Sequence, residues 1–335
     1  MNRPRFLLLL LVLAIGLLAP SVTQAQSTSA LETQVVNGQS YVTGDSIKKF
    51  YGFTAMKKSG RQLTFERKDV RMKFLLGQQD VYMNGVKFIF SFPVLASSKG
   101  CLIHRIDFAK IVHPVLCPWN VNKKGAFDTV IIDPGHGGHD SGARSPHGNG
   151  MEKNHAMEVA NRLSTHLRKR GFKVGLTRST DKYLTLQQRV DFANKFPNAI
   201  FISLHFNSGG GGRAEGIETF TLSPKGVAHY GRGLIASDYK DKPGNAQDSA
   251  NIALATAIHS NCIRYTGRKD RGIRRARYSV ITGVRHPAVL VEGGFLNNRV
   301  EGSLIKSTAY KERLALAIAD AVVKYKVATE KMQRR

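Results

Sequence analysis

From residue 128 to near the C-terminus, short apolar runs alternate with longer amphipathic segments, and this alternation constrains the fold more than any other feature. The apolar runs are DTVIIDP, KVGLTR, AIFISLHFN, GIETFTLS and AVLVEGGFL. Segments between them, such as EKNHAMEVANRLSTHLRKRGF, place apolar residues at helical spacing. Because nearly continuous apolar strands are buried on both faces, we predict an α/β fold with a mostly parallel sheet flanked by helices on both faces.

Residues 34–120 have a different texture, which predicts a small α+β domain ahead of the larger one. The stretch YVTGDSIKKFYG indicates a short helix capped by Asp45 and ending at Gly52. RQLTFER and VRMKFLL alternate like strands, and Asn84-Gly85 is typical of a hairpin turn. The pattern resembles the N-terminal domain first named in copper amine oxidases, an accessory unit of exported wall proteins, and implies no copper chemistry.

The first residues indicate export. A basic start, an apolar run over residues 6–18 and small residues before Ala25 predict a signal peptide at 1–25, followed by a polar linker at 26–33. A membrane anchor is the alternative, but the run is short for a span. We expect a periplasmic or envelope-associated protein with no transmembrane segment after signal removal. Cys101 and Cys117 are compatible with a disulfide or with buried free thiols, and Cys262 would stay unpaired.

The chain is strongly basic, with 50 Lys and Arg against 24 Asp and Glu and a formal net charge of +26. In an exported protein this favours anionic envelope polymers over nucleic acid as partners. Positive charge is dense over residues 264–285, which include Arg274 and Arg277, and residues 328–335 form a basic tail. The dense segment is either a solvated basic face or a lip that attracts substrate carboxylates.

Candidate chemical groups follow the ends of the predicted strands, where ligands bind in such sheets. His136 follows DTVIIDP, His205 ends FISLH, Glu292 ends AVLVE, and Glu152 opens a helix. The glycine-rich loop around His136 lacks the Gly-Lys-Ser/Thr ending of a phosphate loop, so a cation is favoured over an anion. Two imidazoles and a carboxylate suit catalytic Zn²⁺, which keeps one position open for water.

Four motifs in order make residues 127–327 similar to the catalytic domain of the zinc-dependent N-acetylmuramoyl-L-alanine amidases of type 3. They are DPGHGGHDSGA, LTRSTDKYLTLQQRVDFAN, FISLHFN and PAVLVEGGFLNN, with the acidic ligand in MEK. The resemblance implies that one zinc ion per domain is bound by His136, Glu152 and His205, and that Glu292 is the catalytic glutamate. Further motif or neighbouring positions, expected to support the site or the substrate, are His139, Asp140, Arg178, Arg189 and Asn207.

The resemblance implies hydrolysis of the amide between N-acetylmuramic acid and L-alanine in peptidoglycan, in cell-wall remodelling or cell separation. Two alternatives stay open: a zinc peptidase that cuts within the stem peptide, and a non-catalytic protein that binds envelope polyanions. Some relatives carry a blocking helix over the zinc where this chain has residues 226–250. That segment is short and loop-rich, so we do not expect strong self-inhibition; the need for an activator protein stays open.

Overall fold

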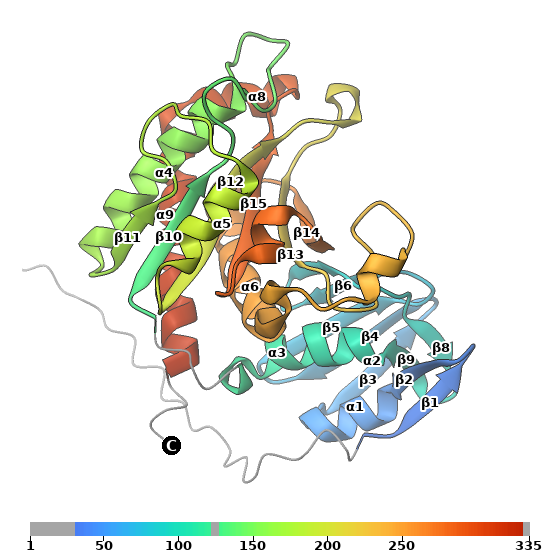
Figure 1. Ribbon diagram of the computed structural model, residues 1–335. Helices are drawn as coiled ribbons and strands as arrows, with labels where there is room; N and C mark the ends of the chain where they lie inside the picture. The colour runs from blue at the N-terminus through green and yellow to red at the C-terminus, as the bar shows by residue number, and fades with distance from the viewer. Residues whose placement is uncertain (1–30, 122–126, 331–335) are drawn as a thin grey trace, which may run out of the picture.

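The computed structural model describes residues 31–121 and 127–330, which form an N-terminal and a C-terminal unit (Figure 1). The predicted signal peptide, most of the predicted linker and residues 331–335 of the basic tail lie outside the described residues. Part of the predicted domain boundary, residues 122–126, lies outside them as well. In the part of the chain that the structure describes, no helix has both the length and the apolar character to cross a membrane.

The N-terminal unit (residues 31–121) contains a four-stranded antiparallel sheet with the order β1-β2-β9-β8. Its strands are β1 (Thr33–Val36), β2 (Gln39–Thr43), β8 (Leu95–Ser97) and β9 (Gly100–His104). Helix α1 (Gly44–Tyr51) ends at Gly52 as predicted, but the predicted cap was wrong. Thr43 caps the helix by accepting a hydrogen bond from the Ser46 amide, because Thr43 keeps the extended backbone of β2 while Asp45 already lies in the first helical turn.

The remaining strands of this unit form an antiparallel meander. They are β3 (Ala55–Ser59), β4 (Gln62–Arg67), β5 (Val70–Leu75), β6 (Asp80–Met83) and β7 (Val86–Ile89). The predicted hairpin is confirmed, since Asn84 and Gly85 join β6 to β7 with φ values of +49° and +82°. Short helical segments follow: α2 (Arg105–Asp107), η2 (Phe108–Val112), α3 (His113–Leu116) and η3 (Pro118–Asn120).

The C-terminal unit (residues 127–330) is built on the sheet order β11-β10-β12-β15-β13-β14. Its strands are β10 (Thr129–Pro134), β11 (Lys173–Leu176), β12 (Ala199–Asn207), β13 (Ile217–Leu222), β14 (Asp270–Ala276) and β15 (Ala288–Phe295). All neighbours are parallel except β13 and β15, which are antiparallel. The predicted α/β class is confirmed, and the antiparallel pair makes the sheet a mixed one.

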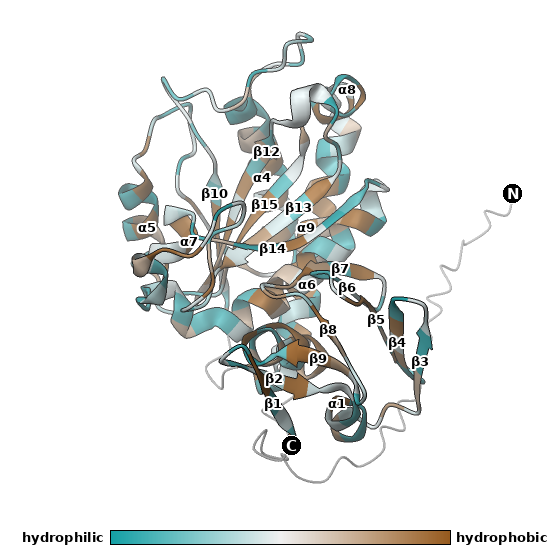
Figure 2. Ribbon diagram, turned by 90° about the vertical axis from the view of Figure 1, so that its right-hand side faces the viewer, coloured by the Kyte–Doolittle hydropathy of each residue, from teal (hydrophilic) through white to brown (hydrophobic). Residues whose placement is uncertain are grey.

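Helices cover both faces of this sheet (Figure 1). One face packs against α4 (Glu152–Lys169), α6 (Asp248–Thr266) and α9 (Thr308–Glu330), and the other against α5 (Leu186–Asn194) and α7 (Ser279–Gly283). Figure 2 shows α7 beside α5. The remaining helices are α8 (Arg299–Lys306), η4 (Gly210–Gly212), η5 (Ala236–Tyr239) and η6 (Pro243–Gln247). Because successive strand residues point to opposite faces, Ile200 and Ile202 join the α4 cluster, and Phe201 joins the α5 cluster.

The two units share one sheet, because β7 pairs with β14 through Ile273 and Phe88. The Lys87 amide donates to Asp270 Oδ2 at 2.9 Å beside this pairing. Asp107 of the N-terminal unit lies 3.4 Å from the Arg275 guanidinium, and both side chains are buried. The sequence pattern did not predict that the meander extends the larger sheet.

The three cysteines are unpaired in the structure, so Cys101 and Cys117 form no disulfide. Burial raises the pKa of the Cys101 thiol to about 12 and that of Cys117 to about 11. These thiols are therefore poor nucleophiles and metal ligands at neutral pH.

Candidate functional site

The loop after β10 turns so tightly that His136 has a φ of +60°, which is uncommon outside glycine. Two glycines let the backbone pass against the candidate metal ligands. A Cβ at Gly135 would lie 2.3 Å from the His205 ring, and a Cβ at Gly142 would lie 2.5 Å from Glu152 Oε2. These glycines therefore provide space for side chains of the site.

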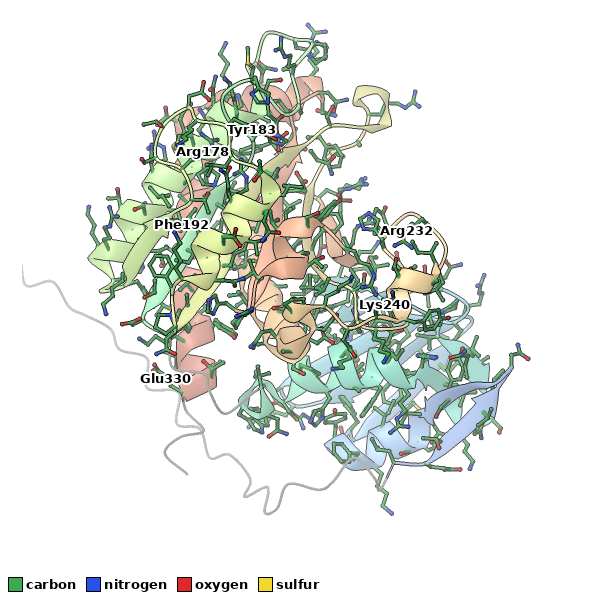
Figure 3. The ribbon with its side chains drawn as sticks, viewed as in Figure 1. Arg178, Tyr183, Phe192, Arg232, Lys240 and Glu330 are labelled. Carbon is green, nitrogen blue, oxygen red and sulfur yellow. The ribbon has the colours of Figure 1, made fainter. Side chains whose placement is uncertain are left out.

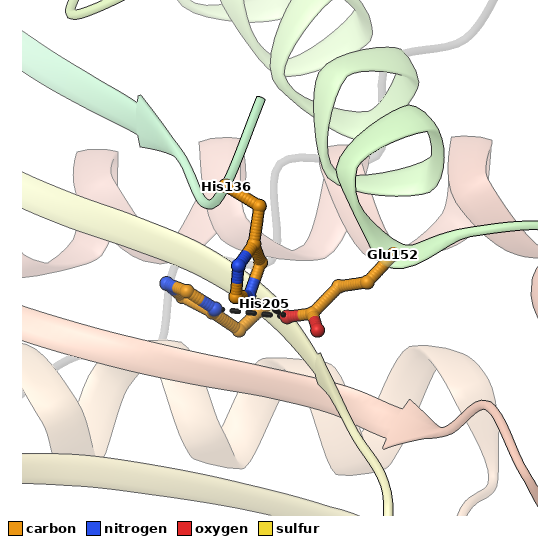
Figure 4. Close-up of side chains that lie close together, drawn as sticks. All are labelled: His136, Glu152 and His205. Carbon is orange, nitrogen blue, oxygen red and sulfur yellow. Dashed lines mark hydrogen bonds and ion pairs between the residues drawn. The ribbon is translucent and has the colours of Figure 1, made fainter. Parts of the chain in front are cut away.

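His136, Glu152 and His205 converge, each offering one ligand atom within 4.8 Å of the others (Figure 4). Glu152 Oε1 lies 3.0 Å from His136 Nε2 and 2.9 Å from His205 Nδ1. The Phe206 amide donates to the same oxygen, and the Ala143 amide donates to Glu152 Oε2 at 2.8 Å. Burial alone would raise the pKa of Glu152, but the two imidazoles lower it below its ordinary range, so the carboxylate stays ionised.

Asp140 orients the first histidine. Its Oδ2 lies 2.9 Å from His136 Nδ1, which leaves Nε2 facing Glu152 and His205, and its Oδ1 accepts from the Gly142 amide. A carboxylate bonded to the far nitrogen of a histidine is a common arrangement around protein metal ions. His139 lies apart from the three ligand atoms, exposed, with its ring centroid 4.1 Å from that of Tyr183.

Arg178 and Arg189 hold the backbone of the loop. Arg178 Nε donates to the Pro134 carbonyl and its Nη2 to the Gly135 carbonyl at 2.8 Å. Arg189 Nη2 donates to the His136 carbonyl at 2.7 Å, and its Nη1 lies 2.8 Å from Asp133 Oδ1. Both arginines are buried, so the structure places them under the turn rather than on the substrate side.

Glu292 lies beside this set, because β15 pairs with β12 in a register that puts it next to His205. Its Oε2 is enclosed and has no hydrogen-bond partner among the described residues. Burial raises the pKa of Glu292 well above its usual value, and the charges of Glu152 and Glu218 raise it further. A carboxyl group with a raised pKa beside a metal site is suited to accept and return a proton.

Glu218 is a residue that the sequence reasoning missed. It lies opposite Glu292 on the neighbouring antiparallel strand β13 and is buried. Asn207 Nδ2 donates to its Oε2 at 3.0 Å, while Arg271 Nε and Arg274 Nε lie 2.8 and 3.2 Å from its Oε1. The available signal was a single acidic residue inside the apolar strand GIETFTLS.

The central arginines of the basic segment 264–285 pair with acidic residues, whereas Arg264, Lys269 and Arg285 are exposed. Arg271 and Arg274 pair with Glu218, and Arg275 pairs with Asp107. Arg277 Nε lies 2.8 Å from Asp238 Oδ1, and its side chain is 9% exposed. Arg274 thus contacts Glu218, and Arg277 contacts the loop after β13, while a role of either residue toward the substrate stays a prediction.

That loop forms the two short helices η5 and η6, and none of its residues belongs to the candidate metal site of the described structure. Because β13 is antiparallel to β15 and Glu218, near the start of β13, lies opposite Glu292, the loop leaves β13 at the far end of that strand from Glu292. It then returns along the face that carries α7, where the ring of Tyr230 lies under the Arg274 guanidinium at 4.3 Å. The structure thus has no long helix here, as expected.

Comparison with known proteins places this geometry in a family. Residues 130–324 match the family model described as N-acetylmuramoyl-L-alanine amidase. The chain is 34% identical over 199 residues to the N-acetylmuramoyl-L-alanine amidase LytC of Bacillus subtilis, covering 59% of this chain and 35% of LytC. It is 29% identical over 225 residues to AmiA of Escherichia coli, covering 61% of this chain and 78% of AmiA.

Among solved structures, the catalytic domain of the amidase CwlV from Paenibacillus polymyxa superposes with a TM-score of 0.50 and 32% identity. The match covers 59% of this chain and 98% of that domain. The predicted family, fold class and enzyme class are therefore confirmed for the C-terminal unit. The chain belongs to the family of N-acetylmuramoyl-L-alanine amidases.

Proposed function

We propose that this protein is a zinc-dependent hydrolase of the amide bond between N-acetylmuramic acid and L-alanine in peptidoglycan. The observation that carries the proposal is the convergence of His136, Glu152 and His205 next to Glu292. The chain spans only about a third of LytC, so the activity of the whole protein is argued from its own residues.

The donor set fits zinc. Two imidazole nitrogens face one carboxylate oxygen, and Asp140 fixes the orientation of His136. Nitrogen and oxygen ligands of this kind, three in number, are typical of catalytic zinc sites. When bound, the ion would polarise the scissile carbonyl and make a water molecule more acidic.

The proton transfers fall to Glu292. Its enclosed Oε2 has no partner among the described residues and is free to take the proton of the attacking water. Water oxygen then bonds to the lactyl carbonyl carbon while the C–N bond breaks, and Glu292 returns the proton to the leaving nitrogen of L-alanine. The second proton of the water stays on the new acid group and dissociates from it, so the products are a free lactyl carboxylate on the sugar and a stem peptide with a free amino terminus.

A digest of purified peptidoglycan tests the proposal. We expect intact stem peptides and unsubstituted sugar chains by mass spectrometry, loss of activity with a chelator, and recovery when Zn²⁺ is restored. Fragments cut within the stem would instead establish a peptidase. Wall binding without cleavage by the zinc-loaded protein would support a non-catalytic binder of envelope polyanions.

We further propose that residues 34–120 are an accessory unit and residues 127–327 the catalytic domain, in an exported protein that acts in the periplasm or cell envelope. The likeness of residues 34–120 to the copper amine oxidase N-terminal domain stays a prediction. The shared sheet supports an accessory unit held firmly against the catalytic domain rather than tethered by a linker.

A further inference from the structure

A groove of about 600 Å³ lies between α5, α7 and the loop that joins β13 to α6. Three cations line it, Arg232, Lys242 and Arg277, together with the hydroxyl groups of Ser237 and Ser279. None of the described residues that line it is acidic. We call this cavity the basic groove. In Figure 3, Phe192 marks α5 on one side, and Arg232 and Lys240 mark the loop on the other.

The basic groove keeps an excess of positive charge. Arg232 pairs with Asp238 at 2.6 Å, and Arg277 shares the same carboxylate, which is fully buried. Lys242 makes no ion pair within the described residues, and Arg277 Nη1 has no hydrogen-bond partner there. The groove lining therefore carries three cations, two of which pair with Asp238, whereas Lys242 also borders a second cavity that Asp241 and Asp248 line.

The groove lies on the same face of the sheet as the catalytic carboxyl. Leu290 packs with Val280 of α7 and Val190 of α5, and Glu292 follows two residues later on that face. Two residues of strand span about 7 Å. Tyr278, between Arg277 and Ser279, is close enough that, after burial, the charges of Glu292 and Glu218 raise its pKa.

The other wall also leads to the metal centre. Leu186, which lines the groove, lies three residues after Tyr183, and the ring of Tyr183 contacts that of His139, an exposed residue of the loop that also carries His136. Because β14 is antiparallel to β15, Arg277 lies toward the end of the sheet at which β15 begins, and a peptide held at Glu292 would have to extend along this face to reach it.

We infer that the basic groove binds a carboxylate of the stem peptide, on the leaving-group side of the amide that is cleaved. This inference rests on the proposed function and names the part of the substrate that this surface recognises. Lys242 supplies the free ammonium group, the paired arginines supply additional positive potential, and the hydroxyl groups supply hydrogen bonds.

The test compares soluble muramyl peptides with free stem carboxylates and with amidated ones, using the full zinc-loaded chain. We expect the protein to prefer the acid form, and Lys242→Gln to raise KM for it about tenfold with little change in kcat or in KM for the amide. Lys240→Gln is the matched control, since Lys240 is exposed on the same loop but does not line the groove.

Equal KM values for the acid and amide substrates in the parent would overturn the inference, as would equal shifts for the two lysine variants. Weaker binding of Lys242→Gln to whole walls, without a change in KM for soluble fragments, would assign the groove to an anionic wall polymer instead. If the parent cleaves neither substrate at the muramyl amide, the proposed function fails, and this outcome is distinct from a loss of acid preference.

Discussion

Two enclosed carboxylates, Asp107 at the junction of the units and Glu292 beside the candidate metal site, have opposite surroundings. Asp107 accepts hydrogen bonds from the Ser91 and Phe92 amides and pairs with Arg275. Glu292 has an oxygen with no partner in the described structure and faces two further carboxylates. A buried carboxylate normally needs hydrogen-bond or ionic partners, so the paired Asp107 stabilises the junction, whereas the unpartnered oxygen of Glu292 is consistent with the proposed proton transfer.

Glu218 shares features with both residues. It is buried and paired like Asp107, and it lies directly opposite Glu292 on the neighbouring strand. Its two arginines and Asn207 stabilise its charge. Like charges opposite each other on antiparallel strands are unfavourable, so this pair costs stability. This loss of stability is consistent with a role of Glu218 in the site, because its charge raises the pKa of Glu292.

The largest expected effect is on activity, from Glu292→Gln. The variant should lose activity by a factor of about 10² to 10⁴, because it keeps the shape but cannot take a proton. Its melting temperature should be unchanged or higher, since an unpaired carboxylate is removed. Stem-peptide release, zinc content and thermal melting measure the three quantities. Activity near the parent level with zinc bound would refute the assignment.

In contrast to Glu292→Gln, the substitution Asp107→Asn should lower the free energy of unfolding and leave kcat nearly unchanged. The substitution leaves the buried Arg275 without its ionic partner, and breaking such a pair costs about 3–5 kcal/mol. Urea unfolding measures the loss, and the kcat of the folded fraction should stay close to the parent value.

The double variant Asp107→Asn with Arg275→Met is the control, because it removes both charges, keeps an oxygen that can accept from a backbone amide, and should recover much of the stability. An equal loss in the single and double variants would show that the ion pair is not what stabilises the junction.

Glu218→Gln should have a smaller effect on both properties. Losing the pairing with Arg271 and Arg274 should cost about 1–3 kcal/mol in unfolding free energy. Because the Glu218 charge raises the pKa of Glu292, its removal should shift the acidic limb of the kcat/KM profile to lower pH. An unshifted profile in a folded variant would show that Glu218 serves stability alone.

These contrasts also show what the sequence could predict. The sequence predicted that His136, His205 and Glu292 lie near one another because they follow apolar runs of parallel strands, although His205 and Glu292 lie within β12 and β15 rather than at their ends. The acidic partners of the basic segment 264–285 could not be predicted from the sequence. Glu218 meets Arg274 only because β13 is antiparallel to β15 and parallel to β14, a register that apolar runs do not encode.

The contact between the N-terminal and C-terminal units could not be predicted from the sequence pattern either. Asp107 and Arg275 are separated by 168 residues, and they meet because β7 docks on the edge strand β14. At shorter range, the sequence predicted the α1 helix and its end correctly but placed the cap on Asp45 rather than Thr43. Local spacing predicts elements, whereas pairing between distant charges depends on packing.

The smallest expected effect concerns Asp238, a further enclosed carboxylate, which resembles Asp107 in being paired. Hydrogen bonds from Arg232 lower its pKa to about 2 despite burial, with help from the Ile235 amide and Arg277. A depressed carboxyl pKa adds stability above the unfolded value of about 3.9, and this contribution disappears as pH falls through about 2. Asp238→Asn should therefore melt below the parent at pH 7, with a difference that narrows between pH 4 and pH 2. A difference independent of pH would mean that the loop is held by the shape of residue 238 rather than by its charge.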